Sequence, residues 1–385
     1  MNSDFIPPWE REDAFPEKPA GDDYGYILRG KFIRCSRDEL MEKCSSTGLP
    51  HIQLVWCPEW PRVAPATQFD FLFDALRKRK RSELKSAVGI GSLNLLIWGV
   101  LGLPTGHHDG LFIWTWVLLL ATTTGVIPVV SGIYGLKKLK RSSTTGTDES
   151  LAVGRYSAWV LSRRILFTWL LLGGIGGVFL VECIHGFPES AKAAGLDKHA
   201  VWHGEWWRLF TGPLLHGNLM HFIFNASALV GLGRLMEVLT SRYHLALVFG
   251  VSALTGSIFS LFLLPATTSV GASGGLLGLI GFLAMLGCRR KQMLPPGFAR
   301  SLAVNVAIIA AMGILAFSII DNAAHLGGFL AGIALGFYLV NSTEQGLPLM
   351  VGTKTKAVGI LAFMVTLSFA AFGIFRICSN PLLQH

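Results

Sequence analysis

Apolar segments long enough to cross a lipid bilayer fill most of the chain beyond residue 85 and constrain its fold more than any other feature. The hydrocarbon core of a bilayer is about 30 Å thick, and a helix of about 20 apolar residues spans it. Only 15% of the residues are charged, whereas about 25% is usual in soluble proteins. We therefore expect an all-α polytopic membrane protein, with helices near residues 88–104, 111–135, 165–186, 218–238, 243–264, 273–288, 299–318, 323–340 and 358–377.

Residues 1–85 are more polar and predict a small α+β cytosolic domain. The aromatic and β-branched residues of Tyr24–Cys35 predict a strand pair, and His51–Trp56 predicts a further strand. The segment Ser36–Cys44 opens with Ser-x-x-Glu, which is a helix capping box. Residues 1–20 are rich in proline, and we expect them to form a loose tail.

The chain divides into four predicted parts. Residues 1–85 form the cytosolic domain, 86–140 an N-terminal membrane hairpin, 160–340 the membrane core and 341–385 an extra C-terminal helix. The first helix of the hairpin is short enough to lie in the membrane interface, and Pro128 should kink the second.

Three cysteines of the polar region, Cys35, Cys44 and Cys57, have His51 between them and would supply the ligands of a Cys₃His zinc site. The Cys-x-x-Cys spacing that is typical of structural zinc does not occur. Reduced structural thiols are therefore the interpretation that we favour.

Basic clusters border the apolar segments, at Arg77–Arg81, Lys137–Arg141, Arg163–Arg164 and Arg289–Lys291. Nucleic-acid binding is one interpretation, but the excess of Lys and Arg in cytoplasmic loops explains the same pattern. A cytoplasmic N-terminus places all four clusters inside and leaves the external loop 105–110 without Lys or Arg.

The first residues are acidic and lack an apolar core, so neither a secretory signal nor a mitochondrial transit peptide is expected. A bacterial inner membrane is the predicted location. The predicted external loop 187–217 carries Trp202, Trp206 and Trp207. We expect this loop to dip into the membrane interface, and an ordinary surface loop with aromatic anchors is the alternative.

Three short polar segments lie in or beside the apolar runs, at His216–Asn225, Gly271–Gly274 and Asn322–Gly328. The predicted topology brings all three to the external face of the membrane. Polar groups inside a bilayer are costly and usually functional. This combination of a serine, histidines and amide donors at one depth predicts proteolysis within the membrane.

Ser273 lies among glycines at the expected start of a helix, where free backbone N–H groups stabilise an oxyanion. A serine hydroxyl is a weak nucleophile until a base takes its proton, and the imidazole of His325 offers that base. His221 and Asn225 are four residues apart, share one helix face and offer further donors to the oxyanion.

Each of these residues also has a plainer interpretation. Small residues around a serine suit helix packing. His216 and His221 would serve as metal ligands, although no His-Glu-x-x-His motif occurs. Asp321 is either a third member of a triad or, as we favour, the cap of the helix that carries His325.

Glycines recur at every fourth residue in Gly328–Gly336, and Gly274–Gly281 also carries glycines on one face. Such small residues permit close helix contact. Close contact is what a hydrogen bond between Ser273 and His325 requires, so packing and catalysis predict the same pattern here.

Together these residues resemble the rhomboid family of intramembrane serine proteases, over about residues 165–340. The matching motifs are the Trp-Arg pair Trp207–Arg208, the His-x₄-His-x₃-Asn pattern of His216, His221 and Asn225, the helix-ending Glu237, Gly271–Gly274 and Ala324–Gly328. The resemblance implies a six-helix core, with additional N-terminal and C-terminal membrane helices in this chain.

The resemblance implies that Ser273 is the nucleophile and that His325 is the general base and then acid, in a dyad without an aspartate. His221, Asn225 and the Ser273 amide would form the oxyanion hole. Structural support would come from Trp207, Arg208, His216, Glu237, Gly271, Gly274 and Gly328.

Substrates, by the same resemblance, would be single-span membrane proteins cut near the external face, with membrane lipids as surroundings and no metal, cofactor or nucleic acid. Leu277 stands where some family members have a tyrosine that packs on the histidine, so the group that orients His325 is open. A catalytically silent relative that binds membrane clients would lack Ser273 or His325, and a transporter would show an inverted repeat.

Overall fold

The computed structural model of the protein describes residues 6–28, 30–47, 54–101, 117–118, 120–141, 148–315, 320–341 and 346–379. Its contacts divide the chain into two compact units. One consists mainly of the chain from Arg163 onward and is called the core here, and the other consists mainly of Pro7–Ser162 and is called the N-terminal unit.

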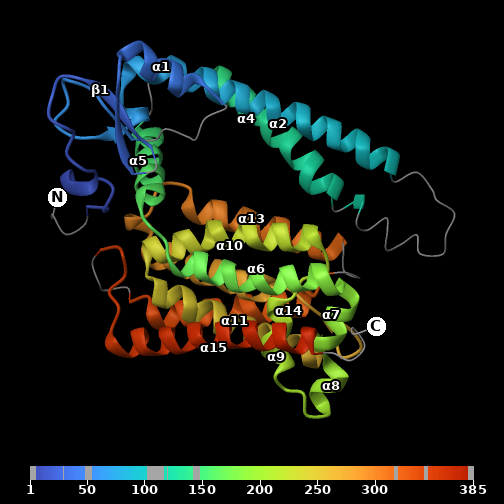
Figure 1. Ribbon diagram of the computed structural model, residues 1–385. Coiled ribbons are helices and arrows are strands. Elements are labelled where there is room, and N and C mark those ends of the chain that lie inside the picture. The colour runs from blue at the N-terminus through green and yellow to red at the C-terminus, as the bar shows by residue number, and fades with distance from the viewer. Residues whose placement is uncertain are drawn as a thin grey trace. The chain divides into compact units, whose positions relative to one another are not determined.

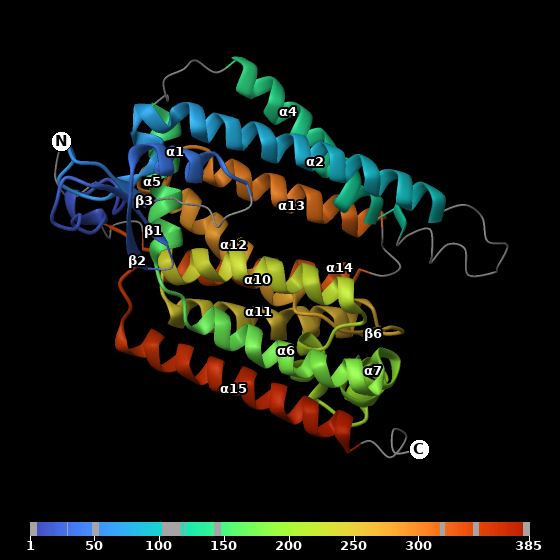
Figure 2. The ribbon, with the colours of Figure 1, turned by 45° about the horizontal axis from the view of Figure 1, so that its top comes forward.

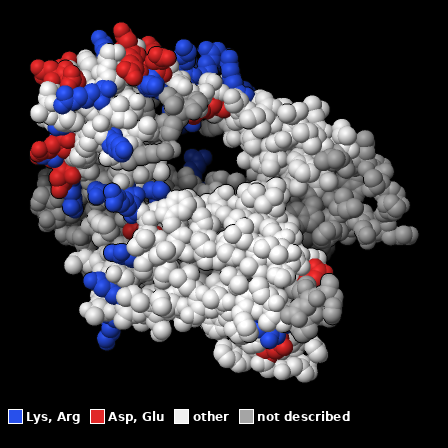
Figure 3. Space-filling view, in the orientation of Figure 1, with Lys and Arg blue, Asp and Glu red and all other residues white. Residues whose placement is uncertain are grey.

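Long apolar helices build the core and lie side by side in Figures 1 and 2. Five are long and apolar enough to cross a membrane: α6 (Phe167–His185), α10 (Leu219–Leu239), α11 (Arg242–Leu263), α14 (Asn322–Leu339) and α15 (Thr353–Cys378). Two shorter apolar helices, α12 (Ser273–Arg289) and α13 (Phe298–Leu315), complete the set. Figure 3 shows a broad uncharged surface over this unit. The predicted all-α polytopic membrane fold is confirmed.

Each of the last seven predicted membrane segments coincides with one of these helices to within a few residues. The agreement is close because the segments are uniformly apolar and end at charged, glycine or polar residues.

The first two predicted segments are corrected in part. The segment 88–104 is not a separate helix, because α2 (Phe73–Leu101) begins well before it, in the basic region. The first part of α2 is rich in Lys, Arg, Glu and Leu, which favour a helix. Hydropathy alone places the start of this helix later, because the charged residues are not apolar. Part of the second segment, residues 111–116 with residue 119, lies outside the described residues.

A π-helical turn at Ala121–Val126 precedes α4 (Ile127–Arg141), whose second residue is Pro128, and the kink at Pro128 stays a prediction. Proline has no N–H, so the carbonyl of Thr124 loses its usual donor four residues on. The side-chain amide of Asn94 in α2 donates to that carbonyl at 3.0 Å instead.

The expected loop between α6 and α10 is folded into short elements: α7 (Phe187–Ala194), β5 (Leu196–Asp197), α8 (Lys198–Trp202), α9 (Arg208–Thr211) and a 3₁₀ turn (Gly212–Leu214). Figure 1 shows α7, α8 and α9 at one end of the long helices. Strand β5 pairs antiparallel with β6 (Thr268–Ser269), which leads into α12. The loop is thereby tied to the start of α12.

The helices α12 and α14 approach each other through glycines. A Cβ on Gly328 would overlap the carbonyl oxygen of Gly274, and a Cβ on Gly332 would overlap that of Gly278. Between apolar helices in lipid, van der Waals packing of this kind replaces the hydrophobic effect as the force that joins them. The predicted glycine contact is therefore present.

In the N-terminal unit, an antiparallel sheet has the order β2-β1-β3-β4. Its strands are β1 (Tyr24–Leu28), β2 (Lys31–Cys35), β3 (Leu54–Trp56) and β4 (Ala64–Pro65), and α1 (Arg37–Ser45) follows β2. The Ser36 hydroxyl accepts a hydrogen bond from the Glu39 N–H at 3.1 Å, which confirms the predicted cap.

Two expectations for this unit were wrong. Residues 7–20 are not a loose tail, because Trp9 is only 1% exposed and its ring lies 4.8 Å from that of Tyr156. The loop expected between the second and third membrane segments contains α5 (Asp148–Ser162), which supplies Tyr156. The proposed boundary at residue 85 falls inside α2, and the four-part division stays a prediction.

Cys44 and Cys57 are buried in the apolar core of the sheet, and Cys35 packs against it. Burial raises the pKa of all three thiols to about 11. His51 lies outside the described residues, and within the described ones no group of His, Cys, Asp and Glu is placed to hold a metal.

The glycine contact between α12 and α14 predicts different effects of one substitution at two sites. Gly332→Ala should lower the unfolding free energy by about 1–3 kcal/mol, because the added methyl overpacks the interface. Gly173→Ala is the matched control, since a Cβ on Gly173 in α6 would meet nothing within 4 Å. Thermal unfolding in detergent micelles measures both, and equal transition temperatures would contradict the packing argument.

The raised thiol pKa of Cys35 predicts its alkylation behaviour. At pH 8 a thiol of pKa about 11 is thiolate in about one molecule per thousand, so iodoacetamide should react slowly and about tenfold faster with each unit of rising pH. Mass spectrometry of the folded protein, with urea-unfolded protein as the control, measures these rates. Faster alkylation upon addition of a chelator would point to a bound metal instead.

Candidate functional site

The serine of the Gly-Ala-Ser-Gly motif is the first residue of α12. Gly271 enters the helix with φ +126°, a backbone conformation that disfavours other residues. A Cβ at Gly271 would also lie 2.5 Å from Cε1 of His221, so the His221 ring rests against this turn. The Gly271 N–H donates to the Gly212 carbonyl at 3.1 Å, which holds the turn against the preceding loop.

His325 lies in the first turn of α14, directly opposite Ser273. Its Nε2 is 2.8 Å from the Ser273 Oγ, a hydrogen-bond distance. Both residues are half-buried. The glycine contact between α12 and α14 is what permits so short a distance between two short side chains.

Asp321 is the N-cap of α14, as predicted, and its Oδ1 accepts from the Ala324 N–H at 2.8 Å. Its Oδ2 accepts hydrogen bonds from the hydroxyls of Ser260 and Ser269. Both carboxylate oxygens are thereby engaged away from the His325 ring, so the arrangement is not that of a Ser-His-Asp triad.

His221 and Asn225 lie on one face of α10, in its first two turns. Asn218 caps this helix, since its Oδ1 accepts from the His221 N–H at 2.9 Å. Asn225 is 7% exposed, and its Nδ2 donates to the His221 carbonyl at 2.9 Å. The structure thus brings His221 beside the turn that precedes Ser273 and places Asn225 one helical turn further along.

His216 is fully buried, with its ring 5.2 Å from that of His221. Its backbone N–H donates to both carboxylate oxygens of Glu182 in α6, at 2.8 and 2.9 Å. Neither ring nitrogen of His216 has a hydrogen-bond partner among the described residues. With two imidazoles but no third ligand, this pair is not a metal centre in the described part of the chain.

Sequence reasoning missed Glu182, although an acidic residue inside the apolar segment of α6 was a visible signal. Its carboxylate supplies the acceptors for the chain where it turns into α10. The residue therefore fixes the entrance of the helix that bears His221 and Asn225.

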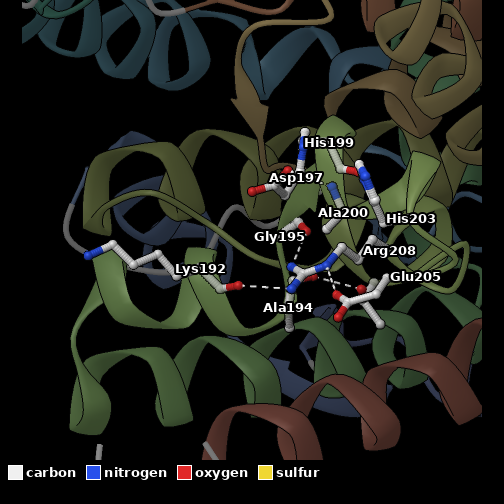
Figure 4. A network of polar contacts seen from close by, with 10 residues as sticks. Lys192, Ala194, Gly195, Asp197, His199, Ala200, His203, Glu205 and Arg208 are labelled. Carbon is white, nitrogen blue, oxygen red and sulfur yellow. Dashed lines mark hydrogen bonds and ion pairs between the residues drawn. The ribbon is translucent and has the colours of Figure 1, made fainter. Parts of the chain in front are cut away.

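Arg208 holds together the folded loop before α10 (Figure 4). Its Nε donates to the Glu205 carboxylate at 2.5 Å, and its two terminal nitrogens donate to the carbonyls of Gly195 and Lys192 at 2.8 and 3.0 Å. The planar guanidinium suits these divergent acceptors. The Arg208 side chain is only 7% exposed, so these bonds are shielded from water.

Trp207 contacts this same guanidinium, which lies 4.7 Å from its ring centroid. The Trp207 ring also lies 5.3 Å from the ring of Phe372 in α15, edge to face. Arg376, also of α15, lies 4.9 Å from the ring centroid. The extra C-terminal helix is therefore packed against the loop rather than set apart from it.

Glu237, near the end of α10, binds the backbone at the start of α6. Its carboxylate accepts hydrogen bonds from the N–H groups of Leu166 and Thr168 and from the Thr168 hydroxyl, at 3.0, 2.7 and 2.7 Å. Acceptors of this kind satisfy the free N–H groups of a helix N-terminus. Glu237 thus joins the start of α6 to the end of α10, and Glu182 joins the end of α6 to the chain just before α10.

The Arg208 network predicts a large effect of its removal. Arg208→Ala would leave the Glu205 carboxylate, the buried Gly195 carbonyl and the part-buried Lys192 carbonyl without their donors, which should cost about 2 kcal/mol of unfolding free energy. Arg208→Lys keeps the positive charge but not the forked guanidinium group, and it should recover only part of the lost unfolding free energy. Lys192→Ala is the control, because the exposed Lys192 side chain points away from Arg208 in Figure 4. Thermal unfolding measures all three, and an Arg208→Ala protein as stable as Lys192→Ala would contradict the analysis.

A family model and several known proteins are similar in sequence to this chain. A family model described as the Rhomboid domain matches residues 203–342. RHOMBOID-like protein 2 of Arabidopsis thaliana is 36% identical over 241 residues, which are 60% of this chain and 69% of that protein. The putative rhomboid protease YdcA of Bacillus subtilis is 30% identical over 146 residues, covering 38% of this chain and 73% of that protein.

Rhomboid protease GluP of Bacillus subtilis is 32% identical over 208 residues, which are 51% of this chain. The chain spans 40% of GluP and 53% of RHOMBOID-like protein 6 of Arabidopsis thaliana, and thus about half or less of these longer relatives. The chain belongs to the rhomboid family, a family of membrane proteins that includes intramembrane proteases.

Proposed function

We propose that the protein is an intramembrane serine endopeptidase that cleaves single-span membrane proteins near the external membrane face. The observation that carries this proposal is the 2.8 Å distance between the Ser273 Oγ and the His325 Nε2. The position of Ser273 at the first residue of α12 supports it further, because a helix N-terminus has free N–H groups that can stabilise an oxyanion.

Ser273 and His325 have these roles in the proposed reaction. The Ser273 Oγ attacks the scissile carbonyl carbon while the His325 Nε2 takes the hydroxyl proton. The imidazolium then gives that proton to the leaving amine, and the peptide C–N bond breaks to leave an acyl ester on Ser273. Water, deprotonated by His325, hydrolyses the ester and restores the free serine.

The negative charge on the tetrahedral oxygen needs preorganised donors. We assign this role to the Ser273 N–H with the side chains of His221 and Asn225. One N–H of the Asn225 amide is bound to the His221 carbonyl, and the amide has a second N–H to donate. The contact of the His221 ring with the turn at Gly271 supports the assignment, because that turn leads directly into Ser273.

Hydrolysis requires water and an extended substrate backbone, and a bilayer core offers neither. The half-buried state of Ser273 and His325 supports access from the aqueous side, and the pairing of β6, which leads into Ser273, with β5 of the folded loop supports it further. Helix-breaking residues in the substrate span would lower the free energy needed to unwind it. The basic clusters support an orientation with the N-terminus in the cytoplasm, and we propose a bacterial inner membrane as the location.

The decisive experiment compares the parent with Ser273→Ala and His325→Ala, reconstituted in lipid with a single-span reporter protein. The parent should cleave the reporter, and each variant should lose at least about a thousandfold in rate, since neither nucleophile nor base has a substitute. A fluorophosphonate probe should label the parent at Ser273 and leave Ser273→Ala unlabelled.

Thermal unfolding provides the control that all three proteins are folded. Cleavage that persists in Ser273→Ala would refute the serine mechanism. A folded parent that neither cleaves nor takes up the probe would favour the catalytically silent, client-binding alternative.

A further inference from the structure

A buried polar cluster that the proposed chemistry does not use lies beside the start of α14. Its cation is Lys198, the first residue of α8, which is only 1% exposed. The Lys198 Nζ donates to the Ser269 Oγ at 2.5 Å and to the Thr267 Oγ1 at 3.3 Å. Ser269 in turn donates to the Asp321 Oδ2 at 2.5 Å, and Ser260 of α11 donates to the same oxygen.

Charge explains why these groups are together. A buried ammonium or carboxylate is costly unless an opposite charge or hydrogen bonds compensate it. Burial lowers the pKa of Lys198 to about 8, while the carboxylates of Asp321 and Asp197 act in the opposite direction. At neutral pH Lys198 therefore keeps its charge, and the Ser269 hydroxyl connects this charge to the Asp321 carboxylate.

The cluster is connected to both members of the proposed dyad through short stretches of backbone. Ser269 belongs to β6 and pairs with Leu196 of β5. It precedes Ser273 by four residues. Asp321 caps α14 with its side chain, and its carbonyl accepts from the His325 N–H at 3.1 Å. The hydrogen bond between Ser269 and Asp321 therefore joins the segment that enters α12 to the turn that holds His325.

We propose that Lys198 is a positioning residue that acts through Ser269 and Asp321 to hold the first turn of α14 against the entrance of α12. The cluster sets the distance between Ser273 and His325 without touching the reacting atoms. It supplies the orienting contact that Leu277, lacking an aromatic ring and a hydroxyl, does not provide for His325. This inference rests on the proposed Ser273–His325 function.

The test measures the rate at which a fluorophosphonate probe labels Ser273, together with thermal unfolding, in Lys198→Met, Ser269→Ala and Ser269→Thr. Lys198→Met and Ser269→Ala should label about 100-fold more slowly than the parent, because a displacement of about 1 Å in the dyad has an effect of that size. Ser269→Thr keeps the hydroxyl and should recover most of the rate. With a reporter that the parent cleaves, kcat should fall by a similar factor while KM changes by less than about twofold.

Thr168→Val is the matched structural control. Thr168 is fully buried, and its hydroxyl donates a hydrogen bond to the Glu237 carboxylate. It lies at the start of α6, whereas Glu182, which binds the His216 N–H, lies near the end of that helix. This variant should lower the unfolding temperature yet label at close to the parental rate while folded. The comparison separates loss of positioning from loss of stability.

A folded Lys198→Met protein that labels as fast as the parent would overturn the inference and leave the proposed function intact. If Lys198→Met does not fold, the pair at Ser269 decides: slower labelling of Ser269→Ala than of Ser269→Thr supports the inference, and equal rates overturn it. A parent that the probe does not label at Ser273 would remove the proposed function, and this inference with it.

Discussion

The contact between α12 and α14, backbone against backbone, is the interaction on which the rest of the site depends. Gly328 and Gly332 meet the carbonyl oxygens of Gly274 and Gly278, so no side chain separates the two helices. Ser273 has a short side chain, and its hydroxyl reaches the His325 ring only at such a separation. In lipid, where apolar surface gains little by leaving its solvent, this packing must supply the attraction between the helices itself.

Buried polar side chains organise the chain around that contact. Glu182, Arg208 and Glu237 each bind backbone groups, at the entrance of α10, in the loop before it and at the start of α6. A buried polar side chain with several backbone partners has its hydrogen-bonding groups satisfied within the protein, and Arg208 also pairs with the Glu205 carboxylate. These residues therefore set where helices begin and how the loop between α6 and α10 folds, and none of them belongs to the proposed dyad.

Buried polar contacts also link the loop before α10 to the proposed dyad. Lys198 enters the core from α8, and its partners lie on β6, α11 and the start of α14. The sequence left Asp321 as a helix cap, the favoured interpretation, or a triad acid, and its carboxylate binds serine hydroxyls and its own helix N-terminus. Its influence on His325 passes through the backbone, which distinguishes orientation of a base from direct hydrogen bonding to its ring.

The sequence by itself determined the membrane class, the positions of the seven long apolar helices α6 and α10–α15, and the motifs that point to Ser273, His325, His221 and Asn225. These follow from hydropathy, helix signals and residue spacing, which are local properties of the chain. Hydropathy misjudged the start of α2 and overlooked α5, because both contain mixtures of charged and apolar residues whose helical propensity a hydropathy profile does not report. Only the tertiary structure decided that Asp321 caps rather than completes a triad, that Glu182 binds the chain at His216 and that Lys198 is buried beside Ser269. Those partners are brought together by contacts between distant segments, and the energy of a buried polar group depends on partners that spacing along the chain does not reveal.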